Sequence, residues 1–250
     1  MSTETFTDGG YRYIPAVFQY SGGVVAEPGM RIERVSFSQV VPLAHGFELI
    51  EKHLAAIGRP NTAFCACELR SPAPFTEQGF RDFNAQYGEV LTRWGILRDG
   101  VNPIARSNVC PEINPPDEPG FHAFSYTVVD PDARPTFVVA GSAECPEGKG
   151  DYRDNVIARG DLSQAGLKTK VQWVLGEMQR RMGMLGFEWP SVTASQVYTV
   201  HDFHPYAGDA LVRSGAMRSG VQWHFARPPV QELEFEMDCR GLPLERVHTV

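Results

Sequence analysis

The chain has 250 residues, of which 42% are hydrophobic, and its formal net charge at pH 7 is −7. This length and composition are sufficient for one large folded domain or for two smaller ones. The negative charge and the absence of any run of Lys and Arg argue against a broad surface for nucleic acid or membranes.

Targeting signals are not evident. No apolar stretch approaches the roughly 18 residues that are needed to span a bilayer. The first ten residues, MSTETFTDGG, lack the basic-then-apolar pattern of a signal peptide. A cytoplasmic protein is therefore expected.

The five cysteines are odd in number and scattered, which is typical of reduced thiols rather than of a disulfide framework. Cys65 and Cys67 alternate as on a strand, so their side chains face the same way. No second pair of ligands has a suitable spacing, and we expect buried thiols here rather than a metal site.

The first half of the chain alternates helical and strand-like patterns. It predicts, in order, a helix at 43–58, a strand at 61–70, a helix at 76–95 and strands at 103–113 and 121–129. Thr76 is the expected N-cap of the second helix.

The second half repeats this order after the proline-rich segment 130–135. The predicted elements are a strand at 135–145, a long helix at 167–186, a strand at 191–200, a short helix at 207–215, and strands at 217–229 and 232–241. We therefore predict two α+β domains, at residues 1–130 and 131–250.

Arg106 stands within the apolar segment NPIARSNVCPEI. A guanidinium stays charged in a protein, so among apolar residues it requires an anionic partner. Glu68 and Glu112 are candidate structural partners, and a bound ligand is the alternative. Arg218 occupies the equivalent place in the second half, and each arginine is followed by a serine.

Several short motifs carry a family resemblance. The two Arg-Ser pairs, LEFEMDC (233–239), VVAGSAECPEG (138–148), FQYSGG (18–23) and FRDFNAQYGEVL (80–91) resemble segments of the Rid family, also called the YjgF or reactive-intermediate deaminase family. The resemblance extends over most of the chain as two copies. It is closest to members of the 2-aminomuconate deaminase type.

This resemblance implies two tandem Rid-like (chorismate-mutase-like) domains, each with a mixed sheet and two helices on one face. It also implies a homo-oligomer, most simply a trimer, with clefts between neighbouring subunits. The implied reaction is cofactor-free hydrolytic deamination of a small carboxylate-bearing enamine or imine, such as 2-aminomuconate or a chloro-substituted analogue. The family arginine binds the substrate carboxylate, and the family glutamate positions water.

The two halves differ in which of the family residues they retain. The second half has Arg218 and a following strand with Glu234, whereas the first half has Tyr20 and Asn84. A complete set therefore requires a first half to meet a second half. Arg218 and Glu234 are accordingly expected to be catalytic, with Tyr20 and Asn84 binding substrate.

A reciprocal cleft would contain Arg106 as a further catalytic candidate, with Asn108, Gly141 and Ser142 as binding residues. It would lack the family glutamate, and Glu112 or His122 are the candidates to replace it.

Each residue also has a structural interpretation. Arg218 is suited to an ion pair with Glu232 or Asp238. Glu234 and Glu236 alternate with apolar residues, as on a strand with one solvated face. The structural alternative is a helix-surface amide for Asn84 and a core or interface aromatic for Tyr20.

His201, Asp202 and His204 have no fixed facing geometry in an extended segment, so neither a metal nor any other cofactor is predicted. Two other functions are compatible with the fold. A non-catalytic ligand-binding or chaperone-like protein is the main alternative. RNA cleavage is disfavoured by the acidic composition.

Overall fold

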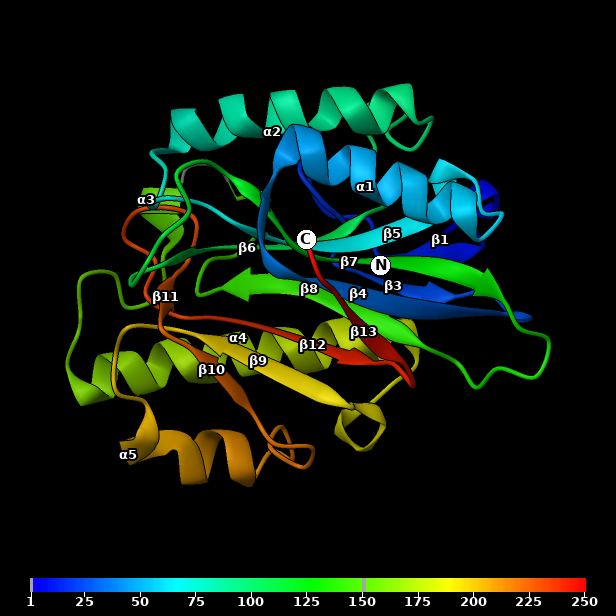
Figure 1. Cartoon of the computed structure of the whole chain (residues 1–250). Coiled ribbons are helices and arrows are strands. Elements are labelled where there is room, and N and C mark those ends of the chain that lie inside the picture. The colour runs from blue at the N-terminus through cyan, green and yellow to red at the C-terminus, as the bar shows by residue number, and fades with distance from the viewer. Residues whose placement is uncertain (1, 150–151) are drawn as a thin grey trace.

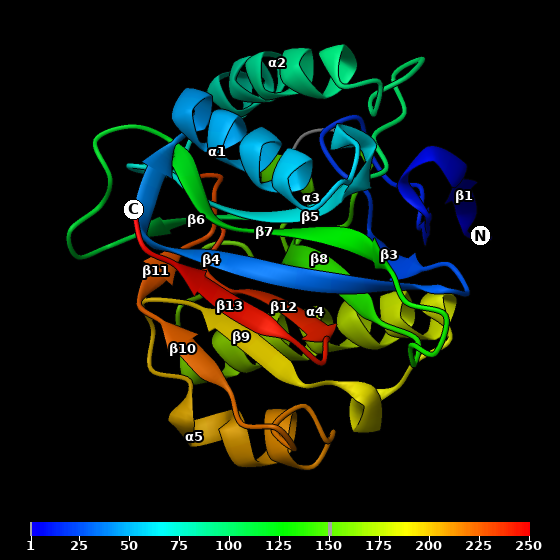
Figure 2. The same cartoon turned by 45° about the vertical axis from the view of Figure 1, so that its right-hand side comes forward.

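The computed structural model describes residues 2–149 and 152–250. Its two β-sheets lie face to face, with α1 (Leu43–Ala56) and α2 (Glu77–Arg93) outside one sheet and α4 (Gln164–Leu185) and α5 (His204–Ala207) outside the other (Figures 1 and 2). The chain therefore forms an α/β/β/α arrangement. Among the described residues, no helix is both long and apolar enough to span a membrane.

The first sheet has six strands. Their spatial order is β11 (Ala226–Arg227), β6 (Ala105–Pro111), β5 (Phe64–Arg70), β7 (Gly120–Val129), β4 (Met30–Pro42) and β13 (Glu245–His248). Strands β5 and β6 are parallel, with Cys67 opposite Arg106, whereas β5 and β7 are antiparallel. The sheet is therefore mixed.

The second sheet has seven strands. Their order is β1 (Glu4–Phe6), β2 (Tyr11–Tyr13), β3 (Gly23–Ala26), β8 (Phe137–Ala143), β12 (Glu236–Gly241), β9 (Ala194–Tyr198) and β10 (Gln222–His224). Its one parallel pair is β9 and β10, which occupy the places that β5 and β6 take in the first sheet. This repeated order confirms the predicted α+β class with two mixed sheets.

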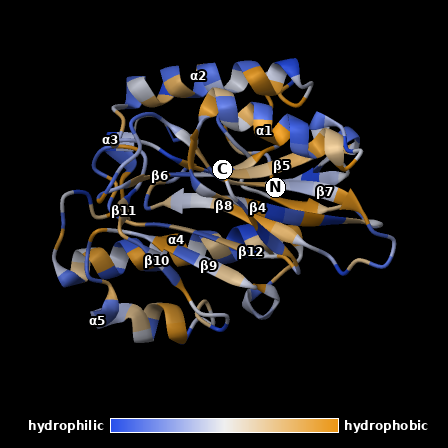
Figure 3. Cartoon of the chain, in the orientation of Figure 1, coloured by the Kyte–Doolittle hydropathy of each residue, from blue (hydrophilic) through white to orange (hydrophobic). Residues whose placement is uncertain are grey.

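Each sheet packs its outer face against amphipathic helices. Thr76 caps α2 as predicted, since its side chain accepts a hydrogen bond from the Gly79 N–H. Helix α2 buries Phe80, Phe83 and Leu91. Along α1 and α2 the hydrophobic and hydrophilic colours alternate in Figure 3, as expected of helices with one face on a core.

Short segments complete the chain. They are α3 (Tyr152–Asn155), the π-helical turn Gly208–Val212 that follows α5, and the 3-10 turns Thr7–Gly9, Asn61–Ala63 and Trp189–Ser191. The helix predicted at 207–215 is thus shorter and begins earlier. The strand predicted at 217–229 is also reduced to β10 and β11, so that Arg218 lies in the turn before β10.

The halves exchange strands. β1–β3 belong to the sheet of the second half, where β3 pairs with β8. In return β11 and β13 join the sheet of the first half, where β13 pairs in parallel with β4. The division at residue 130 remains a prediction, and the sheets are built from chain segments on both sides of it.

The space between the sheets is polar. Arg34 donates two hydrogen bonds to Glu68, at 2.6 and 3.0 Å, and Asp238 accepts from Ser107 and from Tyr198. Glu68 is therefore neutralised by Arg34, and it is not the partner of Arg106 that the sequence offered.

Candidate active site

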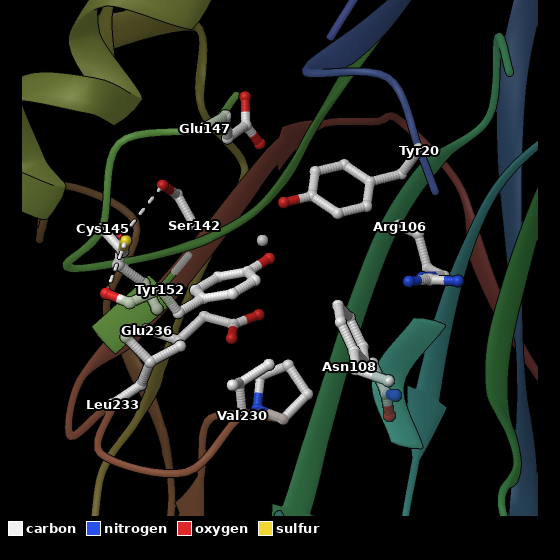
Figure 4. Close-up of a pocket in the computed structure, with 14 residues that line it drawn as sticks. Tyr20, Arg106, Asn108, Ser142, Cys145, Glu147, Tyr152, Val230, Leu233 and Glu236 are labelled. Atoms are coloured by element: carbon white, nitrogen blue, oxygen red, sulfur yellow. Dashed lines mark hydrogen bonds between the residues drawn. The ribbon is translucent and has the colours of Figure 1, made fainter. Parts of the chain in front are cut away.

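A cavity of about 40 Å³ lies where β6 of the first sheet meets β8 and β12 of the second (Figure 4). It is lined by Tyr20, Phe80, Arg106, Asn108, Gly141, Ser142, Ala143, Cys145, Glu147, Tyr152, Pro229, Val230, Leu233 and Glu236. Both halves of one chain contribute, so the cavity is an intrachain site.

Arg106 projects from β6 into this cavity with only 3% of its surface exposed. Its guanidinium carbon lies 5.1 to 5.8 Å from the centroids of four aromatic rings, those of Tyr20, Phe80, Phe83 and Tyr87. The rings stabilise the positive charge. They do not satisfy the N–H donors, and both terminal nitrogens of Arg106 are buried without a hydrogen-bond partner.

Asn108 supplies another free donor. It lies two residues beyond Arg106 on β6, so both side chains leave the same face of the strand. Its Oδ1 accepts a hydrogen bond from Ser71 at 2.9 Å, whereas its Nδ2 is buried without a partner. Buried donors rarely stay unpaired in native proteins. The Asn108 Nδ2 group and the two terminal nitrogens of the Arg106 guanidinium together form a site for a carboxylate.

Glu236 begins β12 and is 3% exposed. Burial, and after it the nearby carboxyl of Asp238, raise the pKa of Glu236 well above its ordinary value. In Figure 4 its carboxyl group points into the space in front of Arg106. The expectation that Glu236 lies on a solvated strand face is wrong, because that face of β12 meets the first sheet.

Gly141 allows Glu236 to reach the cavity. A Cβ atom on Gly141 would lie 2.2 Å from Oε1 of Glu236 and 3.1 Å from the Cα atom of Ser107. A side chain at this position would therefore displace the Glu236 carboxyl group from where it lies. Ser142 follows on β8, and its hydroxyl donates to the Ala143 carbonyl at 3.3 Å.

Tyr20 enters the cavity from a loop that is fixed to β6. The Ser21 N–H donates to the Ile104 carbonyl at 2.8 Å, and the Ser21 hydroxyl donates to the Pro103 carbonyl at 3.0 Å. Burial, and the neighbouring carboxylate of Glu147, raise the pKa of the Tyr20 phenol. Burial also raises the pKa of Tyr152, whose ring faces the same space in Figure 4.

Glu147 is held by Arg181, which projects from α4 and is fully buried. Arg181 donates to Glu147 at 2.8 Å and to the carbonyls of Ala140 and Gly141 at 3.1 and 3.3 Å. It therefore ties the turn after β8 to the helix. Arg181 is not among the residues predicted from the sequence, although a signal exists, since it falls on the helix face that carries Met178 and Leu185.

The other predicted residues lie elsewhere. Arg218 is in an exposed turn, where it donates to the Pro190 carbonyl at 3.2 Å and lines a separate cavity of about 520 Å³. Glu234 contacts His201 at 2.7 Å and Arg227 at 3.8 Å, outside the Arg106 cavity. Asn84 is buried inside α2 and donates to the Phe80 carbonyl at 2.6 Å.

The structure therefore does not bring Arg218 and Glu234 together with Tyr20 and Asn84. It does bring together Arg106, Tyr20, Asn108, Gly141 and Ser142. Glu236 lies where the sequence suggested Glu112 or His122 as the replacement for the family glutamate. Glu112 pairs with Arg227 at 2.8 Å instead, and Arg159 rather than Arg218 pairs with Glu232.

No group of three or more His, Cys, Asp or Glu side chains suited to a metal ion occurs within residues 2–149 and 152–250. His204 contacts Asp202 at 2.8 Å, whereas His201 turns to Glu234. The five cysteines are free and buried.

The sequence of this chain matches a known family. The model of the family described as 2-aminomuconate deaminase CnbZ matches residues 3–246. The chain belongs to this family. A relative in it, the 2-amino-5-chloromuconate deaminase of Comamonas testosteroni, is 51% identical over 244 residues, which is 97% of either chain.

Two solved structures match this chain at low sequence identity. A chorismatase crystal structure has a TM-score of 0.50 at 11% identity, covering 96% of this chain and 79% of the other, and it bears on the fold alone. The Rid-family protein YyfB of Yersinia pestis is 16% identical and has a TM-score of 0.33. The match covers 43% of this chain and 77% of the YyfB chain.

Proposed function

We propose that this protein is a hydrolytic deaminase that releases ammonia from 2-aminomuconate or a chloro-substituted analogue during the breakdown of aromatic compounds. The observation that carries the proposal is the buried, unpaired guanidinium of Arg106 facing the carboxyl group of Glu236 across one small cavity. The family match and the substrate named for the Comamonas testosteroni relative support it.

The carboxylate next to the amino-bearing carbon binds to Arg106 and Asn108. A planar guanidinium with two free donors suits a carboxylate in bidentate geometry. Binding also relieves the cost of three unpaired buried donors, which favours a carboxylate ligand over a neutral one. The reacting carbon is thereby held in front of Glu236.

The reaction has two stages, tautomerisation of the enamine and hydrolysis of the imine. A proton moves from the enamine nitrogen to carbon, giving the 2-imine. Water then adds to the imine carbon, a C–O bond forms, and the C–N bond of the tetrahedral adduct breaks to release ammonia and a 2-oxo acid. No oxidant or reductant is consumed.

Glu236 acts as the acid and then as the base. Burial raises the pKa of Glu236 and so favours the protonated carboxyl group, which can donate a proton to the substrate. The carboxylate that results can accept a proton from the attacking water. Tyr20 and Tyr152, whose phenols stay protonated, are the nearby hydroxyl donors to the adduct.

Ammonia release tests the proposal. Purified protein incubated with freshly generated 2-aminomuconate should release one ammonia per substrate consumed, with formation of the 2-oxo acid followed by mass spectrometry. Tight binding of the substrate without ammonia release would instead support the non-catalytic ligand-binding alternative.

Assembly and location belong to the same proposal. The protein is proposed to act in the cytoplasm as a homotrimer, in keeping with the Rid resemblance. Light scattering tests the trimer.

A further inference from the structure

The Arg106 cavity is too small for the whole of a six-carbon dicarboxylate. Its volume of about 40 Å³ has room for only about three water molecules, because each needs about 10 to 15 Å³ on this measure. An outer cavity of about 170 Å³ adjoins it. The residues that line both are Tyr20, Phe80, Cys145, Glu147 and Tyr152. A substrate anchored at Arg106 therefore extends into the outer cavity.

The charged side chains that line the outer cavity differ in how firmly they are already paired. It is lined by two carboxylates, Glu77 and Glu147, and by one cation, Arg81. Glu147 is already paired with Arg181 at 2.8 Å. Arg81 is only loosely held, since its side chain is 56% exposed, lies 3.9 Å from Glu77 and donates one exposed hydrogen bond to Gln78 at 3.2 Å. Exposed pairs of this kind contribute little, so the guanidinium is free to exchange partners.

Helix α2 carries Arg81 and also packs Phe80 against Arg106 of β6. Phe80 lines both cavities, and its ring centroid lies 5.7 Å from the guanidinium carbon of Arg106. Arg81 is the next residue, and it lines only the outer cavity. The two cations thus line two adjoining cavities that share five residues, an arrangement suited to a linear dianion.

We infer that Arg81 binds the second carboxylate of the substrate, at the mouth of the site. This rests on the proposed function for the identity of the substrate, but it concerns binding alone. The site selects diacids over monoacids through Arg81, whereas Arg106 holds the carboxylate at the reacting end.

Two six-carbon dienes test this without turnover. Muconate has a carboxylate at each end and 2,4-hexadienoate has one, and neither carries an amino group. Calorimetry with the full-length protein should show muconate binding about tenfold more weakly to Arg81→Gln than to wild type, equivalent to about 1.4 kcal/mol. Hexadienoate binding should be unchanged by this substitution.

Arg93→Gln is the matched control. Arg93 lies on the same helix, is exposed and lines neither cavity. It should leave both affinities at wild-type values. Equal muconate affinity in Arg81→Gln and wild type, or an equal loss for both ligands, would overturn the inference. Failure of ammonia release would sink the proposed reaction while leaving these affinities interpretable.

Discussion

Arg106 is the residue on which the proposed chemistry depends most, because its buried charged guanidinium has two free donors at the cavity. Arg106→Gln should lower kcat/KM by about 100- to 1,000-fold, the usual cost of losing a buried charged partner. Arg106→Lys should recover little, since an ammonium lacks the planar fork. Steady-state ammonia release measures both.

Arg218→Gln separates the two arginines. The sequence pointed first to Arg218, but it lies in an exposed turn, and this variant should keep near-wild-type kcat/KM. Arg106→Gln should also melt no lower than wild type, because the unliganded protein loses an unpaired buried charge. Loss of activity in Arg218→Gln with retention in Arg106→Gln would reverse the assignment.

Glu236 makes the pH dependence predictable. The rate should fall as pH rises through the raised pKa of Glu236, where the acid form is lost. Glu236→Gln should lower kcat by about 100- to 10,000-fold and remove this alkaline decline. A pH–rate profile of both proteins measures it, and an unchanged profile in the variant would count against the assignment.

The folding stability should also depend on pH through Glu236. Above the ordinary pKa of about 4.3, the unfolded chain has released the proton that folded Glu236 retains, so stability falls as pH rises toward the folded pKa. Glu236→Gln lacks this loss. Its melting temperature should therefore rise relative to wild type with increasing pH across that interval.

Side-chain directions follow from the sequence where a motif stays within a regular element. Arg106 and Asn108 occupy alternate positions of β6, so their common direction follows from strand geometry. Arg218 was misplaced because its strand begins only at Gln222. Glu236 was overlooked because alternation shows that a face exists but does not show which face meets a second sheet.

At the scale of elements, the approach of β8 and β12 sets the cavity. Gly141→Ala would place a methyl group 2.2 Å from Oε1 of Glu236, so that carboxyl group must move. We expect kcat to fall at least about tenfold, since small displacements of a catalytic group are costly. The loss of stability should stay within about 1 to 3 kcal/mol, as for other overpacked sites.

Gly183→Ala provides the comparison. Gly183 lies in α4, and an added Cβ there has nothing within 4 Å, so activity should be unchanged. Urea unfolding and ammonia release separate the two variants. Wild-type kcat in Gly141→Ala would show that Glu236 need not occupy its present position.

Long elements were predicted well, and short ones were not. The pattern at 76–95 matches α2, whose cap and apolar face are local properties of the sequence. The helix predicted at 207–215 became α5 and a π-helical turn, with only four residues in α5. Segments this short have little intrinsic stability, so tertiary contacts determine their bounds.

The whole molecule is interleaved rather than simply tandem. Strand β3 completes the sheet of the second half and β13 completes that of the first. Such exchanges cannot be deduced from periodicity, because a strand pattern does not specify its neighbour. They matter for function, since they hold the two faces of the cavity together within one chain.

This intrachain site is tested most directly by refolding Arg106→Gln and Glu236→Gln chains together, each inactive alone. We expect the mixture to show only the mean of the two residual activities, whatever the oligomer, because every chain carries one defect in its own cavity. Wild-type chains unfolded and refolded with either variant should recover activity in proportion to their share. A clear gain over the mean in the mixture of the two variants would show that Arg106 and Glu236 meet between chains, and would contradict the site described above.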